Sequence, residues 1–436
     1  MERKFDGRHI FAHFVANVAA WGCNNIYIPC LPNVAADFGI SDSTAKLTIL
    51  LGTAGAILSR IVIGPLSDYF GRKKLLIAFI SICMMGLMGC YFSTSINWFL
   101  FFRCFQGIGS GAVLVEVISI LSDTQSGNKR ARLLGLVELS WPIGWGLSPL
   151  IGAWISAHYS WRMNFVLLVS VLLSVVMFIA CSMPETLKKE KDLQIKNFSL
   201  HKLLRGYATL SKHKLFLSYA MIPGFVLGGY MIFAITGPFI YRDSFAYTPQ
   251  DFALLQAFPL IVYFLTILIY RVIIEKFGFA NAYKVGVALY GIYTSITLMF
   301  LLNVIPSTPN AVISIICSQC LANAFLVPAG AACALQYAQT SLGTAASFIA
   351  IIRNVVVTAL MYISGLFSVT LFGVFALIFS TTVVVLYLTT IRRKKYQEYE
   401  AYASSSRRVG DDNPRSSSTK NILVPQNEQE PESKSA

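Results

Sequence analysis

Long apolar runs alternate with short polar breaks along most of the chain, and the breaks contain Gly, Pro and Asn. An α-helix rises 1.5 Å per residue, so about 20 apolar residues are needed to cross a hydrocarbon core of about 30 Å. The pattern predicts twelve membrane-spanning helices that begin near residues 10, 45, 75, 97, 133, 162, 215, 251, 282, 310, 346 and 373. We expect an all-α membrane protein, because backbone polar groups within lipid must be satisfied inside each helix.

The longest internal polar stretch, residues 185–214, divides the expected helices six and six. It predicts two pseudo-symmetric six-helix bundles, residues 10–184 and 215–395, joined by a basic linker on the cytoplasmic side. A short cytoplasmic segment, residues 1–9, precedes the first bundle. The tail at residues 396–436 is rich in Ser, Asn, Glu and Lys, and we expect it to be disordered in the cytoplasm because it has few apolar groups to bury.

Charge distribution predicts the orientation of the chain. Only 13% of the residues are charged, against about 25% in soluble domains. With twelve spans, most of the 35 Lys and Arg residues fall in loops on the same side as the N-terminus. Basic loops stay cytoplasmic, so we expect both termini in the cytoplasm and the chain in the inner (cytoplasmic) membrane. The net charge of +14 is then a topology signal, and no nucleic-acid partner is expected.

A charged stretch, GPLSDYFGRKK at residues 64–74, separates the second and third expected helices. Its basic residues, such as Arg72, can anchor the cytoplasmic end of a helix, but anchoring does not explain Asp68 or the spacing of Gly64 and Gly71. The stretch resembles the signature found between the second and third helices of the major facilitator superfamily. The match is nearly complete and falls at the corresponding place among the twelve spans.

Other stretches carry the same resemblance. RCFQGIGSG at residues 103–111 is similar to the fourth-helix motif of that family, and GWGLSPLIGAW at 144–154 resembles part of its fifth-helix antiporter motif. NIYIPCLP at 25–32 and TGPFIYRDSFAYTPQDF at 236–252 look like the bicyclomycin-resistance (Bcr/CflA) branch of twelve-span drug:H+ antiporters. In the fifth-helix motif, Ser148 replaces one of the usual glycines.

The resemblance implies a role for the charged stretch as a gate that closes the cytoplasmic side. The candidate gate residues are Gly64, Asp68, Gly71, Arg72 and Asp123. Asp68 could lie against the positive N-terminal end of a helix and pair with Arg72, with Asp123 at the end of the fourth helix as a second partner. Such electrostatic bonds would have to break before the protein opens inward.

Five ionisable residues lie inside the expected spans, where charge is costly and usually functional: Arg60, Arg103, Glu116, Glu138 and Arg353. All except Arg103 lie about 9 to 12 Å from a cytoplasmic helix end and could form one layer. We expect Arg60 to pair with Glu116, with Glu138 as a third member. Two interpretations stay open: a static ion pair that holds the first bundle together, or a carboxylate, Glu116 or Glu138, that takes up and releases a proton.

The first expected helix departs from related antiporters, which often carry an acid before the YxPxLP stretch. This chain has Asn24 and Asn25 there, so proton coupling would have to move to Glu116 or Glu138. Further candidates share a polar or aromatic side chain in spans expected to flank a central substrate cavity. They are Trp21, Asn24, Asn25, Arg103, Gln106, Tyr230, Tyr263, Asn323 and Arg353. A tyrosine at such a position can also serve only in packing or at the membrane interface.

These features predict a monomeric secondary transporter that uses alternating access, with a small, partly apolar substrate and protons as the coupling ion. Multidrug-type efflux in exchange for protons follows from the resemblance alone. The alternatives are a facilitator or importer of a metabolite or siderophore without proton antiport, and a non-transporting membrane sensor. We expect no enzyme, cofactor or metal, because the sequence has no evident nucleophile with a base and no metal-ligand cluster.

Overall fold

The computed structural model describes residues 7–124, 133, 137, 140–186, 200–277, 279–337, 342–366 and 373–385. By their mutual contacts, Met1–Thr389 form one compact unit, which contains all of the described residues. Thr390–Ala436 form a second unit. The predicted disorder of the tail at 396–436 therefore concerns residues outside the described part. The prediction of two bundles joined through residues 185–214 stays a prediction.

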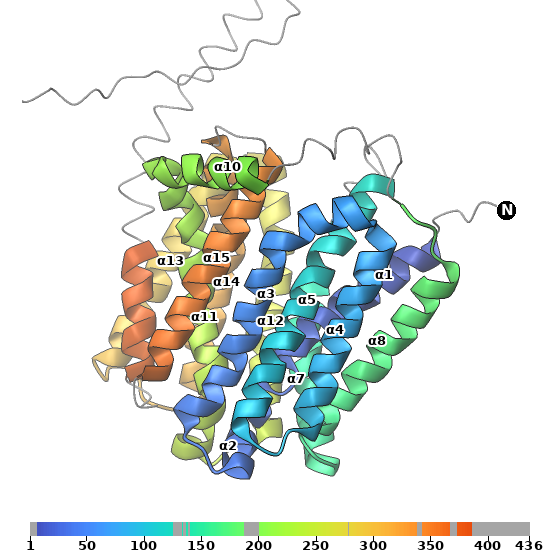
Figure 1. Cartoon of the computed structure of the whole chain (residues 1–436). Coiled ribbons are helices and arrows are strands. Elements are labelled where there is room, and N and C mark those ends of the chain that lie inside the picture. Colours follow the sequence, from blue (N-terminus) through green and yellow to red (C-terminus); the bar gives the residue numbers. More distant parts are fainter. Residues whose placement is uncertain are drawn as a thin grey trace, which may run out of the picture. The chain divides into compact units, whose positions relative to one another are not determined.

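The described residues are almost entirely helical (Figure 1). The first part of the chain forms α1 (Gly7–Asn25), a 3-10 turn η1 (Ile28–Cys30), α2 (Leu31–Phe38), α3 (Asp42–Phe70), α4 (Arg72–Phe92), α5 (Ile96–Thr124), α7 (Ser140–His158) and α8 (Met163–Ser182). The second part forms α10 (Leu200–Lys212), α11 (Lys214–Phe245), α12 (Pro249–Phe277), α13 (Phe279–Leu301), α14 (Pro309–Gln336), α15 (Leu342–Leu366) and a shorter apolar helix, Gly373–Val385. Figure 1 shows α10 lying across one end of the helices of the second part, where it contacts α11 and α15.

The all-α membrane fold class is confirmed. Nine of the described helices are long and apolar enough to cross a membrane: α3, α4, α5, α8, α11, α12, α13, α14 and α15. Helices α1, α7 and Gly373–Val385 occupy the places of the other three expected spans, but they are shorter or less apolar. The count of twelve spans thus stays a prediction. The observed helix starts lie within four residues of the expected ones, apart from the fifth, which is described from Ser140.

Local sequence signals account for several helix ends. Gly39 ends α2 in the left-handed conformation, at φ 61°, which a residue without Cβ adopts at little cost. The Ser41 hydroxyl then accepts a hydrogen bond from the backbone N–H of Thr44 at 3.2 Å and so caps the N-terminus of α3. Thr308 caps α14 in the same way, with Pro309 at the first helical position.

Helices α3 and α5 pack against each other at close range because small residues face each other across their contact. A Cβ on Gly107 would overlap the backbone carbonyl of Gly52, so the two backbones touch there. Further along, Ile63 of α3 forms an apolar cluster with Ala112 of α5 and Phe79 of α4. This cluster fixes how far α3 is shifted along α5, which decides the neighbours of the polar residues that follow.

The second part of the chain contains a comparable apolar cluster, formed by Tyr270 of α12, Ala282 of α13 and Phe325 of α14. Contacts between the two parts run through α7 with α12 and through α3 with α15. Large apolar side chains such as Met177 and Leu254 are exposed on the outside. Such exposure suits helices whose outer faces contact lipid tails rather than water.

Candidate functional site

A single residue, Gly71, separates α3 from α4. Its φ is 94°, a conformation that residues with a Cβ rarely adopt, and a Cβ there would lie 2.7 Å from Glu185 Oε2. The same carboxylate accepts the backbone N–H of Arg72 at 3.0 Å through Oε1. A negative group at the N-terminus of α4 is favourable because the first N–H groups of a helix have no partner within it.

Arg72 connects α4 to both α3 and α5. Its Nε donates to Asp123 Oδ2 at 2.9 Å, and its Nη1 donates to the hydroxyl of Ser67 at 2.6 Å. The side chains of Arg72 and Asp123 are only 8% and 11% exposed. Because water screens this ion pair little, breaking it costs more than breaking a pair on an open surface.

Ser67 extends this network into the membrane-embedded part of the protein. Arginine has no acceptor, so the Ser67 oxygen accepts from Arg72 and the Ser67 hydrogen is free to be donated. It is donated to Oε1 of Glu116, which is 1% exposed. Glu116, Ser67, Arg72 and Asp123 therefore form one continuous chain of hydrogen bonds, which we call the gate network.

Three predicted site residues lie wholly or partly outside this description. Gly64 and Asp68 are in α3, but nothing beyond their backbone position is described, and Glu138 lies outside the described residues. The pairing of Asp68 with Arg72 and the role of Glu138 both stay predictions.

The structure corrects the expected pairing of Arg60 with Glu116. The contact of Ile63 with Ala112 and the hydrogen bond of Ser67 with Glu116 are successive rungs of the α3–α5 interface, each four residues further along its helix. Arg60 lies seven residues before Ser67 on α3, so along the helix axis it is about 10 Å away from the level at which Ser67 meets Glu116. The positive charge of Arg60 is instead repelled by the positive charge of Arg353 on α15.

Arg103 is completely buried and joins three helices of the first part. Its Nε donates to the Thr48 carbonyl of α3 at 3.1 Å, and its Nη1 donates to the Cys23 carbonyl of α1 at 3.0 Å and to the Gln106 side chain. Its Nη2 donates to Asn24 Oδ1 at 3.2 Å. Four hydrogen bonds to the protein hold this guanidinium, so its first role is to fix α1, α3 and α5 relative to one another.

The other cavity candidates of the first part are also engaged with the protein. Gln106 donates through Nε2 to the Ser110 hydroxyl at 3.2 Å, next to Arg103. Asn25 donates through Nδ2 to the Trp21 carbonyl at 2.8 Å, one turn back in α1. The structure thus brings Asn24, Arg103 and Gln106 together, whereas Asn25 bonds to its own helix.

The cavity candidates of the second part lie among aromatic and amide side chains. The Tyr263 ring of α12 is 4.9 Å from the Trp141 ring of α7, and the Tyr230 ring of α11 is 6.4 Å from the Trp145 ring. Asn323 is buried on α14. Both tryptophans were absent from the predicted set, although Trp145 lies within the fifth-helix motif and Trp141 lies four residues before Trp145, on the same helical face.

Buried amides near these residues were also missed by the sequence reasoning. Gln256 lies on α12 seven residues before Tyr263, and Gln319 lies on α14 four residues before Asn323. Both spacings place each pair on one face of a helix. Glutamine carries no charge, so a search for ionisable groups inside the spans passes over it.

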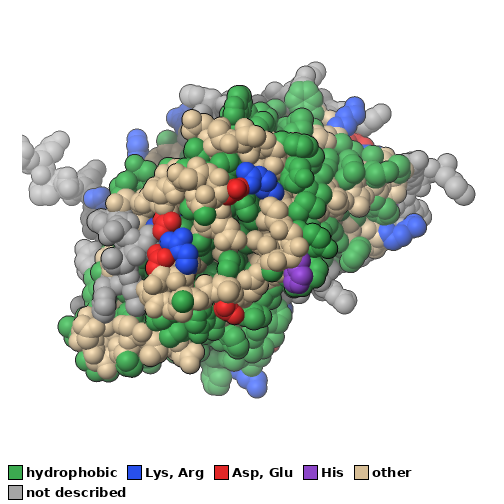
Figure 2. All heavy atoms as spheres, turned by 90° about the horizontal axis from the view of Figure 1, so that it is seen from below, with side chains coloured by type: hydrophobic (Ala, Val, Ile, Leu, Met, Phe, Trp, Pro, Cys, Tyr) green, Lys and Arg blue, Asp and Glu red, His purple; other side chains and the backbone are tan. Residues whose placement is uncertain are grey.

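An ion pair joins the two parts of the chain at the end that is predicted to face away from the cytoplasm. Arg242 of α11 donates through Nη2 to Asp42 Oδ2 of α3 at 2.9 Å, and its Nε bonds the adjacent Asp243. Figure 2 views the molecule from the end at which α2 lies, and it shows acidic and basic side chains in small adjoining groups on a mostly uncharged face. The ion pair of Arg242 with Asp42 was not predicted, because its partners are 200 residues apart in sequence.

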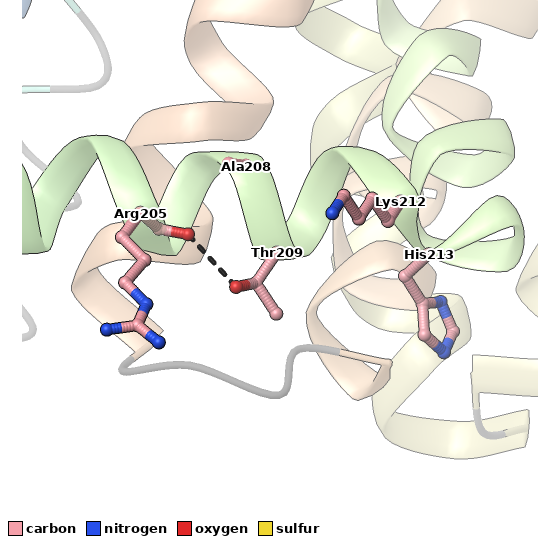
Figure 3. Close-up of a pocket in the computed structure, with 5 residues that line it drawn as sticks. All are labelled: Arg205, Ala208, Thr209, Lys212 and His213. Atoms are coloured by element: carbon pink, nitrogen blue, oxygen red, sulfur yellow. Dashed lines mark hydrogen bonds between the residues drawn. The ribbon is translucent and has the colours of Figure 1, made fainter.

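A hollow of about 450 Å³ lies on α10, lined by Arg205, Ala208, Thr209, Lys212 and His213 (Figure 3). The Thr209 hydroxyl donates to the Arg205 carbonyl at 2.9 Å and is already used. Burial lowers the pKa of His213, and its Nδ1 accepts the backbone N–H of Phe216 at 3.1 Å. The hollow is open and belongs to the basic linker, so it fits the orienting charge of the cytoplasmic side better than a transport site.

The family model of the Major Facilitator Superfamily matches residues 13–248. The MFS-type transporter YdgK of Bacillus subtilis is 27% identical over 252 residues, which are 57% of this chain and 62% of the relative. The bicyclomycin resistance protein homolog of Haemophilus influenzae is 23% identical over 228 residues, 52% of this chain and 56% of the relative. The matches thus span less than two thirds of these relatives.

Solved structures agree at the level of the fold. The xylose transporter XylE from E. coli, in a partially occluded inward-open conformation, has a TM-score of 0.66 at 12% sequence identity. The likeness covers 87% of this chain and 97% of that one. The chain therefore belongs to the Major Facilitator Superfamily, and it resembles the drug-transporter branch of that family.

Proposed function

We propose that the protein exports a small, partly apolar molecule by alternating access and that protons drive the export through Glu116. The gate network is the observation that carries this proposal, because it joins a buried carboxylate to the ion pair at the cytoplasmic ends of α4 and α5. A relative named as a bicyclomycin resistance protein homolog supports a drug-like substrate. The protein would act as a monomer in the lipid bilayer.

The coupling follows from the charge of Glu116. When Glu116 is ionised, its negative charge attracts the Arg72 guanidinium, which is one hydroxyl group away, and the network holds the cytoplasmic side closed. When Glu116 takes up a proton from the exported side, that attraction is lost and Arg72 keeps mainly its contact with Asp123. The gate then opens inward, the proton leaves to the cytoplasm, and the substrate binds for the return step.

Glu116 would replace the acid that related antiporters carry in the first helix. In this chain Asn24 and Asn25 carry neutral amides, which do not release a proton; Asn24 accepts a hydrogen bond from Arg103, and Asn25 donates to a backbone carbonyl. Glu138 remains the second candidate carboxylate. The gate residues Gly64 and Asp68 would complete the cytoplasmic closure beside Gly71, as the motif implies.

The test is proton movement in sealed vesicles that contain the purified protein and a pH-sensitive dye. We expect substrate addition to move protons with the wild type and with Glu275→Gln, an exposed acid at the end of α12. We expect Glu116→Gln to abolish this movement while exchange of labelled for unlabelled substrate continues. Proton movement that survives Glu116→Gln would contradict coupling through Glu116, and movement that survives its combination with Glu138→Gln would also exclude the second candidate carboxylate.

A facilitator or importer without proton antiport is the second candidate. It is favoured by the neutral pair Asn24 and Asn25 in α1, and a relative from Acinetobacter baylyi is named as the niacin transporter NiaP. A facilitator would carry substrate down its gradient at the same rate with and without a pH difference. The same vesicles distinguish the two, because only a coupled exporter accumulates substrate when a pH gradient is applied.

A further inference from the structure

Uncharged polar side chains are buried together in the second part of the chain. They are Tyr230 of α11, Gln256 of α12, and Gln319 and Asn323 of α14, which are 2%, 1%, 0% and 1% exposed. We call these four residues the amide cluster. Within the described part of the protein, neither polar atom of the Gln319 side chain has a hydrogen-bond partner, and the same holds for Asn323 Oδ1, Gln256 Oε1 and the Tyr230 hydroxyl.

Such a concentration of unused hydrogen-bonding groups is unusual. More than nine tenths of buried polar groups in folded proteins find a partner, because desolvation without compensation is costly. One unsatisfied group can be a local imperfection, but five atoms from four neighbouring side chains mark a place where another molecule supplies the partners.

Contacts between the helices show that the members are neighbours. A Cβ on Gly229 would lie 2.6 Å from Gln319 Nε2, so the Gln319 amide rests against α11 directly beside Tyr230. Gln319 and Asn323 are four residues apart on one face of α14. The Tyr230 hydroxyl and the Gln256 amide are close enough to interact, although no hydrogen bond of good geometry joins them.

The amide cluster also reaches the first part of the chain through Trp145 of α7. The Trp145 ring is 6.4 Å from the Tyr230 ring, and its buried Nε1 has no partner among the described residues. Indole N–H groups only donate, whereas Gln256 Oε1 and Asn323 Oδ1 only accept. The site therefore presents donors and acceptors side by side, next to flat aromatic surface.

No member of the amide cluster carries a charge. Arg103, the cation of the cavity set in the first part, already donates four hydrogen bonds to the protein. A charged ligand group buried here would lose its hydration without gaining an opposite charge, which is strongly unfavourable. A group that both donates and accepts while uncharged would satisfy the cluster.

We propose that the amide cluster recognises an uncharged aromatic molecule that carries a carboxamide or an equivalent neutral donor–acceptor group. This inference rests on the transport function proposed above and names the substrate class of that transporter. The carboxamide N–H groups would donate to Gln256 Oε1 and Asn323 Oδ1, and its carbonyl would accept from Gln319 Nε2. The aromatic ring would stack near Trp145 and Tyr230.

Selectivity follows from the same groups. A carboxylate has only acceptors, so it would face the oxygens of Gln256 and Asn323 without a proton to share. An ammonium or pyridinium ion would find no counter-charge among the members of the amide cluster. A site built from buried hydrogen-bonding groups rejects analogues that leave those groups unpaired much more strongly than an apolar pocket does.

The experiment compares matched ligands on the purified full chain in lipid nanodiscs, with thermal stability as the readout. The panel consists of benzamide, benzoate and benzylamine; nicotinamide, nicotinate and 1-methylnicotinamide; and the corresponding naphthalene amide, acid and amine. We expect an amide to stabilise the protein at a concentration at least about tenfold lower than its acid or its cation. Stabilisation by the acids or cations at equal or lower concentration, or by no amide at all, overturns the proposal.

Variants locate the binding. Gln319→Ala and Tyr230→Phe should each raise the half-saturating amide concentration about three- to tenfold, as expected for the loss of one hydrogen bond. Gln319→Met, which keeps the side-chain length, replaces Gln319→Ala if the latter does not fold. The control is Thr266→Val, because the Thr266 hydroxyl is buried on α12 but already donates to the Val262 carbonyl at 2.6 Å. Unchanged amide binding in both cluster variants overturns the proposal.

Binding is measured without a pH gradient, so this test is independent of proton coupling. If Glu116→Gln keeps the amide preference but proton movement proves independent of Glu116, the coupling proposal fails and the substrate class stands. If proton movement depends on Glu116 but the panel favours charged ligands, the substrate class fails and the coupling stands.

Discussion

Ser67→Ala is the most direct perturbation of the gate network. The Ser67 hydroxyl is the link between Glu116 and Arg72, so the substitution removes both hydrogen bonds and leaves the ion pair of Arg72 with Asp123. A hydrogen bond to a charged group contributes about 1.5 to 3 kcal/mol. Two such bonds are removed, so we expect the closed cytoplasmic gate to lose at least about the contribution of one of them relative to the open gate, which is a shift of roughly tenfold or more in their ratio.

The ratio can be measured with spin labels on exposed cytoplasmic residues of the two parts of the chain. Suitable sites are Lys74 on α4 and Ala208 on α10, in a background where the exposed Cys181 is replaced by Ser. Pulsed electron paramagnetic resonance then gives the populations of short and long distances. Ser67→Ala should raise the long-distance population, and this population should become less sensitive to pH because the hydrogen bonds that connect Glu116 to Arg72 are lost and only their through-space attraction remains.

The matched control is Ser119→Ala on α5. Ser119 lies three residues after Glu116, but its hydroxyl donates to the Val115 carbonyl of its own helix at 3.1 Å. Its removal should leave the distance populations unchanged. Equal populations in the wild type and Ser67→Ala at every pH would refute the reasoning, since the link between carboxylate and gate would then have no energetic weight.

Three further substitutions test other features. Gly71→Ala should lower the free energy of unfolding by about 1 to 3 kcal/mol because Gly71 has a positive φ. Gly7→Ala should have no such effect, because Gly7 has open space around it. Equal unfolding temperatures of the two variants would contradict the strain argument. Asp42→Asn should destabilise the closed state of the side that faces away from the cytoplasm by no more than about 1 kcal/mol, because the Arg242 and Asp42 side chains are 40% and 29% exposed. In a spin-label distance measurement, this effect should disappear at high salt. Arg103→Lys should destabilise the protein by about 3 to 5 kcal/mol, because a lysine ammonium cannot reach all of the hydrogen-bond partners of Arg103. An unchanged unfolding temperature would show that these hydrogen bonds are not needed for stability.

The sequence predicted well those features that depend on position along one helix. The family motif indicated the turn at Gly71, and the shared height of Arg72 and Asp123 at cytoplasmic helix ends suggested their proximity. Counting residues also gave Arg60 and Glu116 similar depths. It could not give their directions, because these depend on the register between α3 and α5, which small residues set through close packing.

Ser67 and the amide cluster were missed for a different reason. A serine that faces its neighbouring helix looks the same in sequence as one that bonds its own backbone, as Ser119 does. Glutamines such as Gln256 and Gln319 cost less to bury than charges, so they do not stand out in an apolar span. Their meaning depends on whether a partner is present, and partners come from other helices.

The adjoining charges of Arg60 and Arg353 have a consequence for leakage. These two arginines come from α3 and α15, which contact each other between the two parts of the chain. One positive charge opposes another cation at about 8 Å by roughly 2 kcal/mol when the effective dielectric constant is about 20. If protons drive transport as proposed above, two positive charges along this seam would oppose the passage of hydronium and sodium ions while the two parts of the chain move.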